Sequence, residues 1–446
     1  MFVLERLRAS PDSAKEFTLD AGTASSMAVV VTRSQDPERV WPHLQLLGWL
    51  SNAVLLLVVL LDTLHFSPHS DNLWQLNLVR QLRQNSRAAA TLVDANRIFP
   101  DLVVAAGLDR LWHALGFELS GTAYVRCVVV LNVVLLVLIS DAVRRRFGAV
   151  AGTTTSALLL LLVSTNEYFL EIIRPGFHTT ASLILLIWMF RRFIPHRPLA
   201  SGDILLLTAL CISSRIFLVM VIVPCLMAQF AFSPSGVRVR RCLPLVAAGL
   251  LSTVGWLAIR FVPHLYIVAF DSSPHFAILG GLPSEFARNA TGRPFMGQST
   301  PLWVRCSWLY LVTAGVTVVA AVLAILARGR FRLRADTRQL STVVGLSLVI
   351  GSVIMRMVNY VVEGRMYVLM LPIVGSVVCV SPVLHEVTSR WSFSKPRGSI
   401  FGRVLVVILV CVATVCGIGN SVALASSGKH DRYPTVAALQ IGRAHV

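Results

Sequence analysis

The sequence predicts an all-α fold: a polytopic membrane helix bundle of about 11 transmembrane helices, with amphipathic helices in its first outer loop. Three observations predict it. Of the 446 residues, 55% are hydrophobic and only 14% are charged, and the mean hydropathy is +0.71, which excludes an ordinary soluble domain. Apolar stretches long enough to cross a bilayer recur along the chain. The basic residues gather in the short segments between them.

The net charge of +18 has a different meaning here than in a soluble protein. A soluble chain this basic would suggest a nucleic-acid partner, whereas arginines in short segments between apolar stretches set membrane topology. We therefore expect membrane lipids, and no nucleic acid, as partners. The 8 cysteines include no CxxC pair and no interleaved histidine. Neither a disulfide framework nor a zinc site is predicted.

The N-terminal segment 1–43 is polar and basic and lacks the apolar core of a cleaved signal. We predict that it is cytoplasmic and that the first span is an uncleaved anchor. A transmembrane domain follows over residues 44–420, because apolar stretches of about 20 residues cross a bilayer as helices. The predicted spans are 44–61, 122–140, 147–164, 175–190, 204–212, 216–232, 243–261, 306–327, 340–355, 367–383 and 404–418.

Arginine-rich segments determine the predicted orientation. When the spans are threaded alternately through the membrane, all these segments fall on the side of the basic N-terminus, which is the cytoplasm. We predict a multi-pass protein of a bacterial inner membrane with a periplasmic C-terminus and two long outer loops, 62–121 and 262–305. The arginine-rich segments are 144–146, 191–197, 238–241, 328–338 and 390–403.

The two short spans 204–212 and 216–232 could instead be one helix with Arg215 in its middle. We predict a break near Ser213 and Ser214, because an arginine at the centre of a span costs about 2.5–3.5 kcal/mol on insertion scales. One continuous span would also move the next arginine-rich segment to the outer side.

The C-terminal end has two predicted parts. Residues 421–440 are expected to form an outer-side tail. Residues 441–446 match the in-frame translation of a common sequencing adapter. We expect them to be an artefact, and the natural protein to continue past Leu439.

Asp71 lies in the first outer loop, before a stretch whose alternating apolar and basic residues predict an amphipathic helix to about Arg87. A second short helix is predicted over 102–115. Two interpretations of Asp71 stay open. It can act as a general base that takes a proton from an acceptor hydroxyl. Alternatively, Ser70 and Asp71 can cap the helix that begins near Asn72.

Further charged residues cluster at the outer ends of the predicted spans. Such charges are costly in a membrane unless they are paired or line a wet cavity, so together they predict a polar cavity open to the outer side. Asp62, at the end of the first span, is interpreted as an ordinary interfacial residue. One short turn contains Glu167, Glu171, Arg174 and His178. This turn either orients a substrate or holds a structural ion pair between Glu171 and Arg174.

Arginines near the outer ends of spans are candidates for binding a lipid phosphate. Arg365 opens a late span, and Arg215 lies in the predicted helix break. The planar guanidinium suits a phosphate group, although an arginine in this position can also anchor its helix at the membrane interface. Arg174 and His178 are further candidates for the same role.

Taken together, these features resemble the GT-C superfamily of polyprenyl-phosphate-sugar-dependent membrane glycosyltransferases. The resemblance extends over most of 44–418 and rests on the first outer loop, the helix pair around Ser213-Ser214-Arg215 and the late span that begins Arg365-Met366-Tyr367. It implies an enzyme that transfers a sugar from a lipid-linked donor to an acceptor on the outer face. Asp71 would be the base, and Arg365 and Arg215 would hold the lipid phosphate.

The lone Asp71 departs from the commoner family pattern of two adjacent acids, so no cofactor is predicted and a divalent metal is left open. Two other functional classes also stay open. A transporter or flippase would usually show internal repeats, and the sequence shows none. A polysaccharide polymerase or ligase would place functional arginines in a large outer loop, where this chain has Arg288 and Arg293.

Overall fold

The computed structural model divides by its contacts into Met1–Pro42 and His43–Val446, and the helix bundle belongs to the second unit. The described residues are 42–64, 70–84, 93–94, 98–165, 170, 173–175, 179–194, 197–259, 261–262, 265–266, 308–326, 333–357, 370–391 and 397–426.

The described residues are almost entirely helical. The first part of the bundle contains α2 (Pro42–Leu64), α3 (Ser70–Gln84), β1 (Val93–Asp94), η3 (Ile98–Leu102), α4 (Val103–Ala114), α5 (Gly121–Phe147) and α6 (Ala149–Thr165). The second part contains α8 (Thr179–Trp188), η4 (Met189–Phe193), α9 (Ser201–Ser213), α10 (Arg215–Phe217), η5 (Leu218–Ile222), α11 (Val223–Phe232), α12 (Ser235–Ile259), β2 (Leu265–Tyr266), α14 (Trp308–Leu326), α15 (Ala335–Met357), α16 (Met370–Trp391) and α17 (Arg397–Ser426). The η elements are π-helical turns.

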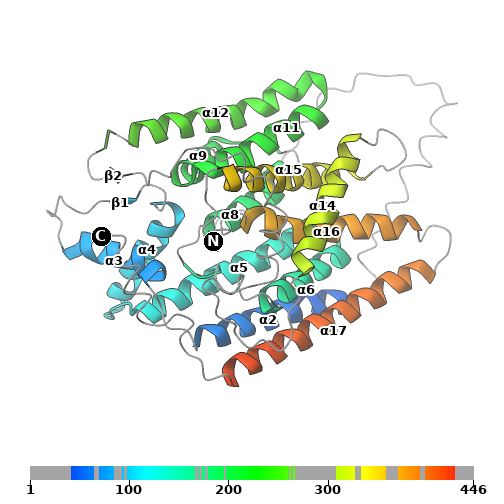
Figure 1. Ribbon diagram of the computed structural model, residues 1–446, viewed down its shortest axis with the longest axis horizontal. Coiled ribbons are helices and arrows are strands. Elements are labelled where there is room, and N and C mark those ends of the chain that lie inside the picture. The colour runs from blue at the N-terminus through cyan, green and yellow to red at the C-terminus, as the bar shows by residue number, and fades with distance from the viewer. Residues whose placement is uncertain are drawn as a thin grey trace, which may run out of the picture. The chain divides into compact units, whose positions relative to one another are not determined.

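The helix α6 lies at the centre of the packing. Every side chain from Ala151 to Thr165 is buried, and α6 contacts α5, α16 and α17. Figure 1 shows α2, α6 and α17 side by side. The buried hydroxyls of residues 154–156 donate to carbonyls one turn earlier in α6, so these three polar groups are satisfied within the helix.

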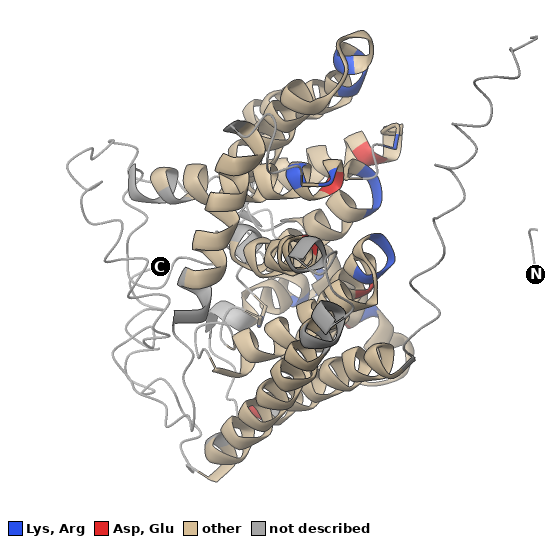
Figure 2. Ribbon diagram, turned by 90° about the vertical axis from the view of Figure 1, so that its right-hand side faces the viewer, with Lys and Arg blue, Asp and Glu red and all other residues tan. Residues whose placement is uncertain are grey.

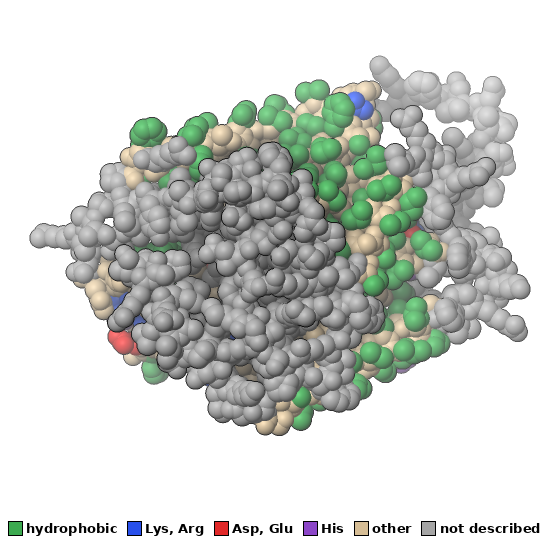
Figure 3. Space-filling view, in the orientation of Figure 1, with side chains coloured by type: hydrophobic (Ala, Val, Ile, Leu, Met, Phe, Trp, Pro, Cys, Tyr) green, Lys and Arg blue, Asp and Glu red, His purple; other side chains and the backbone are tan. Residues whose placement is uncertain are grey.

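Outer helices of the bundle expose large apolar side chains. Figure 3 shows green apolar surface along α12, where the exposed residues are Leu243, Leu250, Leu251, Val254 and Leu257. A bilayer solvates such a face, whereas water does not. In the described part of the chain, four helices are long and apolar enough to cross a membrane, namely His43–Thr63, Gly121–Phe147, Ser235–Ile259 and Val404–Ala423. The chain is a helical membrane protein.

Charged side chains collect where α5 ends and α12 and α15 begin, a region that we name the arginine end. Arg146 Nη2 lies 2.5 Å from Asp336 Oδ2 and links α5 to α15. Arg192 Nε lies 3.4 Å from Asp203 Oδ1 and links η4 to α9. Figure 2 shows basic residues on several helices at this end, with acidic residues beside them. Acids of neighbouring helices therefore neutralise part of the arginine clusters.

Each predicted span overlaps a helix, and the predicted helix break is confirmed. The helix α9 ends at Ser213, Ser214 is extended with φ −146° and ψ 99°, and α10 begins at Arg215. The two helices predicted in the first outer loop are present as α3 and α4.

Several helices are longer than the predicted spans, α2 and α17 among them. The helix α2 continues to Leu64, so Asp62 belongs to the helix, and its burial corrects the interpretation of an ordinary interfacial residue. The helix α17 continues to Ser426, beyond the predicted end of the last span. Asn420 Nδ2 donates to the Ser164 carbonyl at 2.8 Å and holds this extension against α6. Residues 427–446, which include the expected adapter artefact, lie outside the described residues.

One short parallel strand pair was not predicted. Val93 of β1 pairs with Leu265 of β2, and Asp94 pairs with Tyr266. This pair joins the first of the two long predicted outer loops to the second.

Candidate functional site

The end of α2 that leads into α3 and α4 carries a buried ion pair. We name the region around the end of α2, together with α3 and α4, the α3 end. Arg174 Nη2 lies 2.6 Å from Asp62 Oδ2, and the two side chains are only 1% and 3% exposed. Charges this deeply buried in a membrane protein are expensive and typically mark functional positions. The ion pair also fixes the segment after α6 against the end of α2.

Asn132 of α5 holds the same segment from a second side. Its Nδ2 donates to the Ile173 carbonyl at 2.7 Å, and its Oδ1 accepts from Thr180 Oγ1 at 2.8 Å. Both of its amide atoms are therefore used, which makes the burial of this polar side chain tolerable. The backbone just before Arg174 is thereby tied to α5 and to the first turn of α8.

The first outer loop folds back into the bundle at η3. The Phe99 backbone N–H donates to Ser213 Oγ at 3.0 Å, at the break between α9 and α10. Asp101 is buried, and its charge lies within electrostatic reach of Tyr124. The π-helical turn η3 also contacts α3, α8 and α9. An acid is therefore buried at the α3 end that the sequence analysis did not select as a candidate.

The helix α3 is attached to the elements around it by two arginines. Arg83 Nη1 lies 3.2 Å from Asp109 Oδ2 of α4, and the Arg80 guanidinium donates to the Leu119 carbonyl. The side chain of Gln75 is completely buried, and neither its Nε2 nor its Oε1 has a hydrogen-bond partner. Asp71 occupies the first turn of the same helix, four positions earlier, so the two positions share a helix face.

Among the predicted site residues, the structure brings Asp62 and Arg174 together. Asp62 and Arg174 pair with each other, whereas the sequence analysis considered Glu171 as the partner of Arg174. The phosphate-binding role of Arg174 stays a prediction. Arg215 begins α10 immediately after the helix break. The side chains of Asp71 and Arg215 lie outside the described part of the chain, as do the whole residues Glu167, Glu171, His178 and Arg365.

Sequence reasoning missed the Asp62–Arg174 pair and Gln75, and it counted Asp101 among the outer-side acids without selecting it as a site residue. The Phe99-Pro100-Asp101 stretch could have indicated Asp101, because it places an acid beside a proline at the start of a helix. Among the described residues, no group of three or more His, Cys, Asp or Glu side chains is placed to hold a metal ion. When the chain is compared with known proteins, no family model, no curated protein and no solved structure matches it.

Proposed function

We propose that this chain is a membrane glycosyltransferase of the GT-C type. It would transfer a sugar from a polyprenyl-phosphate donor to an acceptor hydroxyl at the α3 end. The proposal rests on the resemblance given above and on one structural observation, the buried Asp62–Arg174 pair. Ionisable side chains inside a membrane bundle are by default candidates for a functional site.

The position of the pair supports the proposal because it anchors the last turns of α2 to the segment after α6, a few residues before α3 begins in the sequence. A catalytic group must be held within a fraction of an ångström of its productive position by a rigid surround. Asp71 lies in the first turn of α3, a helix that Arg80 and Arg83 attach to its surroundings. These two contacts hold the second half of α3, and through the rigid helix they limit how far its first turn can move.

In the proposed reaction, the Asp71 carboxylate takes the proton of the acceptor hydroxyl. The acceptor oxygen forms a bond to the anomeric carbon of the donor sugar, and the bond from that carbon to the phosphate oxygen breaks. Its electron pair leaves with the polyprenyl phosphate. Arg365 and Arg215 would stabilise the negative charge that develops on the departing phosphate.

The proposal includes a topology. About 11 helices would cross the inner membrane of a bacterium, with the N-terminus in the cytoplasm and the α3 end facing the periplasm. The arginine-rich segments that gather at the arginine end support this orientation.

A transporter or flippase is the second candidate, and the interrupted helix supports it. The extended Ser214 separates α9 from α10, and η5 adds a π-helical turn directly after it. Broken helices of this kind line substrate pathways in many transporters.

The transferase proposal is tested with the full-length gene expressed in membranes that are supplied with labelled polyprenyl-phosphate sugars. We expect Asp71→Asn to lower sugar transfer by about 10²–10⁴-fold, the typical contribution of a general base. Glu118→Gln is the matched control, because Glu118 is an exposed acid of the same loop, and it should leave transfer unchanged. Full activity of Asp71→Asn would refute the assignment of the base. Label that accumulates inside vesicles without a covalent product would favour the transporter.

A further inference from the structure

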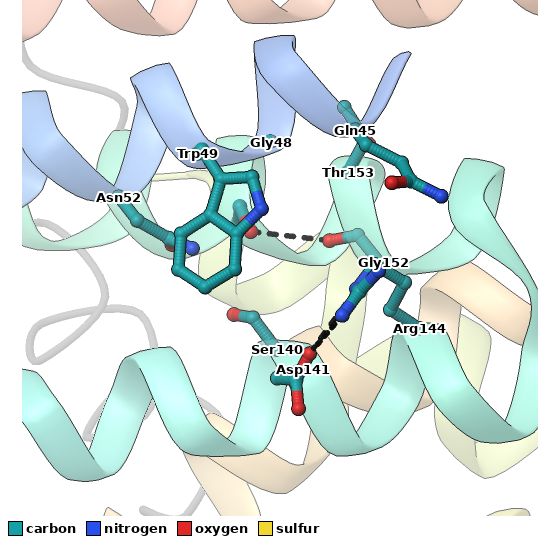
Figure 4. A pocket seen from close by; sticks show the side chains of 10 residues that line it. Gln45, Gly48, Trp49, Asn52, Ser140, Asp141, Arg144, Gly152 and Thr153 are labelled. Carbon is teal, nitrogen blue, oxygen red and sulfur yellow. Dashed lines mark hydrogen bonds and ion pairs between the residues drawn. The ribbon is translucent and has the colours of Figure 1, made fainter. Parts of the chain in front are cut away.

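Several arginines at the arginine end are neutralised by an acid. Figure 4 shows one such pair, in which Arg144 Nε donates to Asp141 Oδ1 at 3.1 Å. The other pairs are Arg145 with Asp141, Arg146 with Asp336 and Arg192 with Asp203. The buried Glu386 of α16 accepts hydrogen bonds from the Arg334 backbone N–H and the Thr337 hydroxyl. The acids described at this end are therefore already engaged.

Arg238 of α12 and Arg338 of α15 are different. Neither forms an ion pair with an acid in the described part of the chain, and each lies over an aromatic ring instead. Arg238 Cζ lies 4.6 Å from the centroid of the Phe230 ring. Arg338 Cζ lies 5.4 Å from the centroid of the Phe232 ring. Both rings belong to the last turn of α11, so cations from two other helices flank this turn.

The two guanidinium groups are within reach of a ligand. In each of them only Nε is buried without a partner, and both side chains are partly exposed. Arg238 Nη2 donates to the Ser233 carbonyl at 3.4 Å, a long hydrogen bond that leaves other N–H donors of the guanidinium unused. The site is an open surface at the end of α11, so its ligand needs no enclosed cavity.

Apolar surface adjoins Arg238 on the membrane side. Phe230, whose ring lies under the guanidinium, and Leu243, farther along α12, are both 63% exposed. Met227 of α11 and Val239 of α12 are exposed as well. Figure 3 shows basic atoms beside the green apolar surface where α12 begins. Arg238 therefore lies where a lipid-covered surface meets water, which is the level of the phospholipid headgroups.

The charge of this surface selects among headgroups. The planar guanidinium matches a phosphate group, and basic clusters between helices at the membrane boundary attract anionic lipids. A zwitterionic headgroup also carries an ammonium or trimethylammonium group, which Arg238 and Arg338 repel. The surface therefore favours a phospholipid with net negative charge.

We propose that the last turn of α11 binds an anionic phospholipid from the leaflet at the arginine end. The headgroup phosphate would accept hydrogen bonds from the Nη groups of Arg238, and the acyl chains would follow the exposed apolar side chains of α11 and α12. Arg338 would add positive charge from the side of α15. This site is independent of the proposed sugar transfer, which takes place at the α3 end.

The test uses the full chain, purified in detergent and stripped of lipid, with bound lipid counted by native mass spectrometry. We expect phosphatidylglycerol to bind about tenfold more tightly than phosphatidylethanolamine or phosphatidylcholine, because both of these carry a cancelling positive charge. Equal binding of the three lipids overturns the proposal, and this comparison needs no variant. Soluble glycerol 1-phosphate, which has a phosphate but no acyl chains, should compete only at far higher concentration. Binding of this compound as tight as that of the lipid would overturn the assignment to a membrane lipid.

Variants then locate the site. Arg238→Gln should weaken binding of phosphatidylglycerol about tenfold, because it removes the charged donor to the phosphate. Arg338→Gln should weaken binding by a smaller factor. Arg240→Gln is the matched control, since Arg240 is an exposed arginine of the same helix, and it should bind as the unmodified chain does. An equal loss in Arg238→Gln and Arg240→Gln would show that net charge, and not this site, attracts the lipid.

Discussion

Arg174 and Asp62 form a buried ion pair across 112 positions of sequence, with Nη2 and Oδ2 2.6 Å apart. The pair joins the segment after α6 to the last turns of α2. Removing two charges from water costs several kcal/mol per ion before their attraction is counted. Such a pair is weak evidence for stability and stronger evidence for a position that must be fixed.

We expect Arg174→Leu to destabilise the protein by about 3–5 kcal/mol, because it removes the guanidinium that lies against the buried Asp62 carboxylate. The double variant Asp62→Leu/Arg174→Leu removes both charges and should be less destabilised than either single variant. Thermal unfolding of the purified chain in detergent measures all three. Losses that simply add in the double variant would show that the two side chains are energetically independent.

Asn132 supplies the second attachment of the same segment, and its replacement should be costly. Asn132→Leu leaves the Ile173 carbonyl and the Thr180 hydroxyl without this partner, at about 1–3 kcal/mol for each unsatisfied group. Thr180→Val removes one of these two hydrogen bonds and is the smaller control perturbation. Unfolding midpoints should therefore fall further for Asn132→Leu. The reverse order would contradict the role given to Asn132.

The helices were predictable because the bilayer fixes their length and composition, and each predicted span overlaps an observed helix. The break at Ser214 was also predictable, since Arg215 makes a continuous span too expensive. Both inferences use only neighbours in the sequence.

The candidate site was less predictable because its contacts join distant parts of the chain. The apolar run of the first span ends at Leu61, and nothing local indicates that α2 continues and buries Asp62 against Arg174. The burial of Gln75 and the pairing of β1 with β2 depend in the same way on how the first outer loop folds back. Such contacts are set by tertiary packing and not by residue pattern.

At the arginine end, buried and partly buried acids should differ in their contribution to stability. Glu386 is buried and accepts hydrogen bonds from the Arg334 backbone N–H, at 2.8 Å, and from the Thr337 hydroxyl. Glu386→Ala should lower the unfolding free energy by about 1–3 kcal/mol.

Asp336→Ala is the comparison for Glu386→Ala. Its partner Arg146 is 37% exposed, and Asp336 itself is 22% exposed. A solvent-screened pair contributes about 0–1 kcal/mol, so this variant should unfold almost as the unmodified chain does. Equal losses in the two variants would contradict the distinction between the buried and the partly buried acid.

The proposed topology predicts which exposed positions a membrane-impermeant thiol reagent reaches in intact cells. Glu118 and Arg240 are both exposed and lie near opposite ends of the bundle. In a cysteine-free background, Glu118→Cys should be labelled from outside, and Arg240→Cys should be labelled only after the membrane is opened. Labelling of Arg240→Cys in intact cells would reverse the orientation.

The proposed function requires the α3 end to bind a polyprenyl phosphate beside Asp71. A structure of the full-length protein with bound polyprenyl phosphate tests it most directly. We expect the phosphate to lie at the α3 end, within several ångströms of the Asp71 carboxylate and in contact with the Arg365 or Arg215 guanidinium. A phosphate bound elsewhere, with Asp71 facing bulk water as the cap of α3, would contradict the account and leave the transporter as the stronger candidate.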